Sequence, residues 1–141
     1  MTIFPTHHCF DDALDLLVQF LREDPAGGLE HSRFWLVHGI ARYPEGQPHA
    51  GERFAHAWVE TFDKRVWDCG VLDGELITYS VDRAEFYEKL RIETTTRYSA
   101  RAAWDENRRS GTYGPWQPEY QALCRHHGSP QADDAVREET A

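Results

Sequence analysis

A histidine, an aspartate and a cysteine in this chain have the types and spacing of a nucleophilic triad. His56 lies in the apolar run FAHAWVE at residues 54–60, which is typical of a strand, and Asp68 lies in the next strand-like run, across a short connection. A histidine whose ring is held by a carboxylate is the base half of such a triad. The nucleophile has to come from elsewhere in the chain, and Cys9 stands just before a predicted helix.

Cys9 has two interpretations when it is taken alone. At a helix start, unpaired backbone N–H groups and the positive end of the helix dipole favour a thiolate. The neighbouring acidic residues Asp11 and Asp12 act in the opposite direction. The alternative is a small buried thiol that only packs in the core, as free cysteines often do.

The histidine and the aspartate are also ambiguous singly. Alternation along the strand places His56 on the same face as Trp58, so a core histidine with satisfied hydrogen bonds is one interpretation. Asp68 lies in an apolar strand and needs a partner, because burying an unpaired charge is costly. His56, across the hairpin, is near enough to supply that partner. A hydrogen bond between the two would fix the imidazole tautomer and leave the other ring nitrogen available as a base.

The elements that would hold these residues alternate between helices and antiparallel strands. Predicted helices cover residues 11–23, 83–90, 100–109 and 119–126, and predicted strands cover residues 34–41, 53–62, 65–71, 75–80 and 91–98. The dipeptides Asp63-Lys64 and Asp73-Gly74 are short enough to be hairpin turns, and Asp82 and Ser99 are expected helix caps. This order predicts an α+β fold with an N-terminal helix packed on a mostly antiparallel sheet and small peripheral helices.

Composition limits the class of protein. The 141 residues fit a single domain, expected over residues 1–127, with a polar and flexible tail at residues 128–141. The net charge of -9 argues against nucleic-acid binding, because the phosphate backbone would repel the chain. No apolar run is long enough to span a membrane, and no leader segment is expected. The three widely spaced cysteines predict neither a disulfide framework nor a zinc ribbon, so a reduced cytoplasm is the expected location.

The ordered set of motifs resembles the core of the transglutaminase-like proteins within the papain-like cysteine-protease fold, as a small member of bacterial or phage type. The matching features are the segment CFDDA at residues 9–13, the strand at residues 34–39, the string HAWVE at residues 56–60 and the pair Trp67-Asp68. The resemblance covers residues 9–70. It implies that Cys9 is the nucleophile, His56 the base and Asp68 the orienting acid in acyl transfer at a peptide, isopeptide or glutamine amide.

Four further residues are candidates for contact with a protein or peptide substrate: His38, Trp58, Tyr113 and Trp116. His38 is expected to share a pocket with His56. The segment at residues 113–116 (YGPW) is either a flap over a cleft or an aromatic loop clamped on the core.

Three alternatives remain beside the enzyme. A non-catalytic binding or inhibitory module on the same fold would keep His56 and Asp68 as structural polar groups. In a rival alignment the nucleophile would stand where this chain has Val37, and would therefore be lost. A metal-dependent hydrolase would use His38 and His56, but no paired ligand spacing supports it, so neither a metal nor another cofactor is expected.

Overall fold

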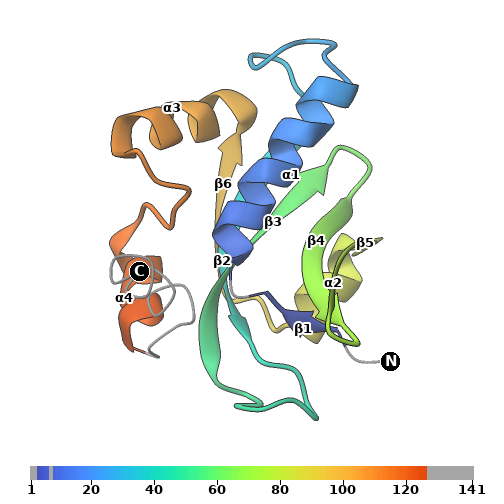
Figure 1. Ribbon diagram of the computed structural model, residues 1–141, viewed down its shortest axis with the longest axis vertical. Helices are drawn as coiled ribbons and strands as arrows, with labels where there is room; N and C mark the ends of the chain where they lie inside the picture. Colours follow the sequence, from blue (N-terminus) through green and yellow to red (C-terminus); the bar gives the residue numbers. More distant parts are fainter. Residues whose placement is uncertain (1–2, 7, 127–141) are drawn as a thin grey trace.

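The computed structural model describes residues 3–6 and 8–126, which form a six-stranded, mostly antiparallel sheet and four helices (Figure 1). The strands are β1 (Phe4–Pro5), β2 (Phe34–Arg42), β3 (Arg53–Thr61), β4 (Arg65–Leu72), β5 (Glu75–Asp82) and β6 (Thr94–Ser99). The helices are α1 (Cys9–Glu23), α2 (Arg83–Lys89), α3 (Ala100–Ser110) and α4 (Pro118–His126). The predicted α+β class is confirmed. The tail expected at residues 128–141 lies outside the described residues.

Both predicted helix caps are present. The side chain of Asp82 accepts hydrogen bonds from the N–H groups of Ala84 and Glu85, at 3.1 and 3.4 Å. Ser99 accepts one from the N–H of Ala102, at 3.1 Å. These side chains satisfy backbone donors that have no partner inside the helix, and so fix where α2 and α3 begin.

Two of the predicted boundaries that differ from the structure have a clear local cause. The first helix begins at Cys9 and not at Asp11, because the carbonyl of His8 already accepts the N–H of Asp12 at 2.8 Å. Cys9 therefore lies within the first turn. The last strand begins at Thr94 and not at residue 91, because Arg91 adopts a left-handed backbone with φ 48° and completes the end of α2.

The sheet carries a separate core on each face. In Figure 1, α1 lies in front of the sheet and α2 lies behind it. Alternation along β3 divides the cores as predicted. Ala55 and Val59 belong to the cluster under α1, whereas Phe54 and Trp58 pack with Phe86 of α2. Helices α3 and α4 complete the core on the α1 side.

Strands β3 and β4 pair over only a short stretch and then diverge. Their register joins Val59 to Trp67 and Glu60 to Val66, close to the turn that connects them. Farther along, β4 pairs instead with the N-terminal strand β1, which takes the place of β3 beside residues 70 and 71. Figure 1 shows the two strands separating from their shared turn, with β1 and the start of α1 between their far ends. Asp68 lies where the fork opens.

The close approach of β1 depends on a glycine in β4. A Cβ atom at Gly70 would lie 2.4 Å from a methyl carbon of Ile3 and 3.1 Å from the carbonyl oxygen of Phe4. A side chain here would push the N-terminal segment away from β4. The fork is therefore built around a position without a side chain.

None of the helices in the described part of the chain is long and apolar enough to cross a membrane.

We predict that Gly70→Ala lowers the free energy of unfolding by about 1–3 kcal/mol, because the new methyl group overpacks the junction of β1 and β4. Chemical denaturation measures this. In an Ile3→Ala background the same substitution should cost less, because the nearest clashing atom is gone. An equal cost in both backgrounds would show that contact with Ile3 is not the reason for the glycine.

Candidate active site

His56 and Asp68 form a buried pair inside the fork. Nε2 of His56 lies 2.8 Å from Oδ2 of Asp68, and the two residues are 1% and 4% exposed. The tyrosine hydroxyl of Tyr79 donates to the same carboxylate oxygen at 3.0 Å, and the N–H of Cys69 donates to the other at 2.9 Å. Three donors thus hold the carboxylate in one orientation, and the carboxylate in turn orients the imidazole.

The surroundings of His56 favour its protonated form. Burial has the largest effect on the pKa of His56 and lowers it. The charge of Asp68 and its hydrogen bond, followed by smaller contributions from Cys9, act in the opposite direction and raise the pKa to about 10. The Asp68 carboxylate therefore outweighs desolvation, and the imidazolium is the favoured state at neutral pH.

Cys9 reaches the same imidazole from the first turn of α1. It is 5% exposed, and its Sγ lies 4.0 Å from the carbonyl oxygen of Ala55. That carbonyl belongs to the part of β3 that has no partner on β4. The thiol therefore lies against the backbone of the residue before His56, and Cys9 also raises the pKa of His56. Nδ1 of His56 makes no regular hydrogen bond within the described residues. The fork thus brings together the three residues predicted for the triad.

The start of α1 also offers backbone donors. The first helical hydrogen bond runs from the N–H of Asp12 to the carbonyl of His8. The N–H groups of Cys9 and Phe10 come before this bond and take no part in the helical ladder. They lie at the positive end of the helix dipole, beside the thiol, where they can stabilise negative charge.

His38 does not join this cluster. Its ring lies on the α1 side of the sheet, with ring centroids 4.7 Å from Phe10, 5.0 Å from Tyr98 and 5.1 Å from Trp116. The ring of His56 lies instead beside Trp58 on the α2 side. Neither ring nitrogen of His38 has a hydrogen-bond partner in the described part of the chain, and burial lowers the pKa of His38 to about 3. It is a neutral core histidine in an aromatic cage.

The other three residues proposed for substrate contact lie in different environments. Trp58 has no exposed surface, and its indole N–H donates to Glu60 at 3.0 Å. Trp116 packs against His38 and Tyr98, which matches the interpretation of this loop as a clamp on the core. Tyr113, at 40% exposure, presents its ring to solvent.

Glu60, the buried carboxylate near the end of β3, is already compensated. It is fully buried and accepts hydrogen bonds from Trp58 and from the hydroxyl of Tyr87. Arg97 and Arg83 lie 3.0 and 3.7 Å from its other oxygen. Among residues 3–6 and 8–126, no group of three or more histidine, cysteine or acidic side chains is arranged to hold a metal ion.

Two tyrosines at the site were missed by the sequence analysis. Tyr79 faces Asp68 across the β4–β5 hairpin, so the turn at Asp73-Gly74 gave a usable signal for it. Tyr43 stacks on Phe54 with ring centroids 4.2 Å apart. Nothing in the local pattern pointed to Tyr43, because it lies at the start of a loop.

The chain has no match among protein-family models, curated proteins or solved structures. Its function is therefore argued from the geometry of this site and from the motifs in its sequence.

We predict that the His56–Asp68 pair makes stability decline in alkali. The pKa of His56 is higher in the folded protein than in the unfolded chain, so the pair contributes fully below about pH 6.5 and loses its contribution as the pH rises towards 10. The free energy of unfolding should fall between pH 7 and 9.5, by at most about 1.4 kcal/mol per pH unit. Denaturant titrations at several pH values measure this.

In Asp68→Asn the alkaline decline should flatten. His49→Gln, which removes an exposed histidine, serves as the control and should show the same alkaline decline as the native chain. Parallel declines in the native chain and in Asp68→Asn would contradict a stabilising buried ion pair.

We predict the opposite dependence for His38. Because burial lowers its pKa in the folded protein, the unfolded chain takes up a proton first as the pH falls below about 6.5. Native stability should therefore fall relative to His38→Leu, by about 2 kcal/mol at pH 5. Denaturation of both proteins from pH 7 to 4.5 measures the difference, with exposed His31→Gln as the control. If the difference stays constant with pH, His38 does not remain neutral in the core.

Proposed function

We propose that the protein is a cysteine-dependent enzyme on a papain/transglutaminase-like scaffold, which transfers or hydrolyses the acyl group of a peptide, isopeptide or glutamine amide. Cys9 is the nucleophile, His56 the base and Asp68 the residue that orients the imidazole. The observation that carries the proposal is a buried cluster in which the thiol of Cys9 lies against the backbone next to His56, and His56 pairs with a carboxylate held by three donors.

The chemistry proceeds by two proton transfers. Cys9 and His56 start as a thiolate and an imidazolium that carries its second proton on Nδ1, and the thiolate attacks the amide carbon to form a tetrahedral intermediate. His56 then gives the Nδ1 proton to the leaving nitrogen as the C–N bond breaks, which leaves a thioester on Cys9. Water or an amine, deprotonated by Nδ1 of His56, attacks the thioester and releases the thiolate of Cys9, which restores the starting pair.

The surroundings support both halves of this cycle. The raised pKa of His56 favours an imidazolium beside a thiolate, which is the charge-separated pair that attacks. Asp68 keeps its hydrogen bond to Nε2 throughout, so the ring presents Nδ1 to the sulfur at each step. The N–H groups of Cys9 and Phe10 are placed to receive the negative charge of the tetrahedral oxygen.

A non-catalytic binding or inhibitory module is the second candidate. It is favoured by the burial of the triad, because Cys9 exposes only 5% of its surface in this conformation. An enzyme has to admit the substrate to that sulfur. A binding module would keep the same pair for structural reasons alone.

Alkylation of the intact protein separates the two candidates. Under the enzyme proposal, iodoacetamide near neutral pH modifies Cys9 faster than Cys124 and much faster than Cys69, whose pKa burial raises to about 11. In His56→Ala the rate at Cys9 should fall by about tenfold or more, because the cation beside the thiolate is lost. Mass spectrometry of tryptic peptides measures each rate.

Two further variants make this result interpretable. Asp68→Asn preserves the shape of the core and should also slow the reaction at Cys9, whereas exposed His49→Ala should not change it. Circular dichroism checks that each variant is folded. Labelling of Cys9 that is slow in the native chain and independent of His56 would exclude the enzyme and favour the binding module.

A further inference from the structure

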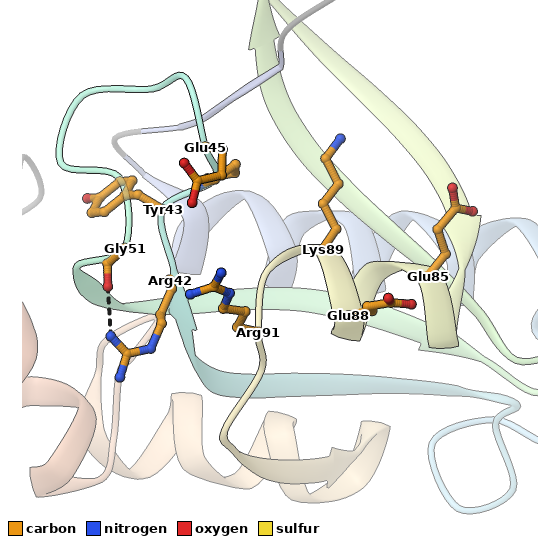
Figure 2. Close-up of a pocket in the computed structure, with 9 residues that line it drawn as sticks. Arg42, Tyr43, Glu45, Gly51, Glu85, Glu88, Lys89 and Arg91 are labelled. Carbon is orange, nitrogen blue, oxygen red and sulfur yellow. Dashed lines mark hydrogen bonds between the residues drawn. The ribbon is translucent and has the colours of Figure 1, made fainter.

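A hollow of about 410 Å³ lies between the loop after β2 and the end of α2 (Figure 2). Its volume falls within the range of about 300–1,000 Å³ that small-ligand sites occupy. Tyr43 and Gly51 of the loop form one wall, and Glu85, Glu88 and Lys89 of α2 form the other. It opens on the side of the sheet that carries the ring of His56, since Tyr43 and α2 both pack on the core of that side.

Charges of both signs line the hollow. Figure 2 shows Arg42 and Arg91 towards the loop, and Glu85 and Glu88 on the helix. Arg42 is already engaged, because it donates to the carbonyl of Gly51 at 2.7 Å and to the carboxylate of a neighbouring glutamate. Arg91, Glu85 and Glu88 have no side-chain hydrogen bond or ion pair to any other residue in the described part of the chain. The guanidinium of Arg91 and the carboxylates of Glu85 and Glu88 therefore line this space with their charges unpaired.

The other two charges of the lining modify this picture only in part. Lys89 lies four residues after Glu85 on α2, but no ion pair joins the two in the described part of the chain, so Lys89 adds a second unpaired cation. Glu88 keeps its charge uncompensated. Glu45 adds a further carboxylate from the loop side. A ligand with a single negative charge would meet Arg91 favourably but would be repelled by the glutamates.

Arg91 is held in a conformation that suits glycine. It follows Leu90, the C-cap of α2, with φ 48°, the left-handed position where helices commonly place a glycine. The hydrogen bond from the N–H of Ile92 to the carbonyl of Tyr87, at 3.0 Å, fixes this turn. A guanidinium is thus kept at a position where its backbone is strained, and that strain points to a use for the side chain.

Tyr43 connects the hollow with the triad. Its ring lines the hollow and stacks on Phe54, and the ring of Phe54 lies 5.5 Å from that of His56. Burial raises the pKa of the Tyr43 hydroxyl, with smaller contributions from the charges of Cys9, Glu52 and Cys124. Two aromatic side chains, Tyr43 and Phe54, therefore lie between a group bound in the hollow and the ring of His56.

We propose that this hollow is the subsite for a dipolar segment of the substrate, whose carboxylate pairs with Arg91 and whose ammonium group pairs with Glu88. Its role as a substrate subsite rests on the proposed function of the triad. Its preference for a dipolar ligand depends only on the charges that line it.

Three probes of equal length test the charge preference: 6-aminohexanoate, hexanoate and hexylamine. Their affinities for the full chain are measured by titration of ¹H–¹⁵N NMR spectra. The dipolar probe should bind about tenfold or more tightly than either singly charged probe, because only it pairs with both charges. The shifted amide signals should come from residues 42–51 and 85–91.

Arg91→Gly is the decisive variant, because glycine suits the left-handed backbone and leaves the fold intact. The substitution should weaken the binding of 6-aminohexanoate by about tenfold or more. Lys64→Gly is the matched control: Lys64 is also a cation at positive φ, 62°, and lies outside the lining. It should leave binding unchanged. Equal affinities for the three probes, or full binding by Arg91→Gly, would overturn the proposal.

A second measurement separates this proposal from the function of the triad. Saturating 6-aminohexanoate should slow the alkylation of Cys9 and leave that of Cys69 unchanged. Binding without protection of Cys9 would overturn the role as substrate subsite. Alkylation of Cys9 that is independent of His56 would instead overturn the proposed enzyme, while the probe affinities would still report the charge preference of the hollow.

Discussion

The divergence of β3 and β4 at Asp68 is the constraint on which the candidate site depends. If their ladder continued in the same register, Gly70 would lie opposite His56, and no space would remain between the strands. Because the strands separate, β1 pairs with β4 and the first turn of α1 enters the gap. Because β4 does not pair with this part of β3, the carbonyl of Ala55 can accept the hydrogen bond from the thiol of Cys9. One break in a ladder thus creates the space for the thiol beside the imidazole.

The buried polar groups of this core have different protonation states because their neighbours differ. Asp68 and Glu60 are each surrounded by donors, and each has a cationic partner, so their charges are compensated inside the protein. His56 shares in one of these pairs and is stabilised as imidazolium. His38 is equally buried but surrounded by aromatic rings, and is therefore neutral. The two histidines, on neighbouring strands, thus differ in protonation state because only His56 has a carboxylate partner.

Local patterns predicted most of the fold. Caps at Asp82 and Ser99 and the turn at Asp73-Gly74 placed elements correctly, because these signals act within a few residues. Alternation in β3 correctly assigned its two faces. The error at the start of β6 arose because Arg91 occupies a left-handed position without the glycine that usually marks it. The shared pocket expected for His38 and His56 failed for a different reason: the two rings lie on opposite faces of the sheet.

The sequence by itself determined the hairpin that sets His56 near Asp68, because the two residues lie on consecutive strands joined by a short turn. Only the tertiary structure decided that Cys9 reaches that imidazole, since the contact spans 47 residues and depends on how α1 enters the fork. The tertiary structure also decided the hollow that Tyr43, Arg91 and the carboxylates of α2 line. Contacts between distant segments follow from packing, which no local pattern in the chain encodes.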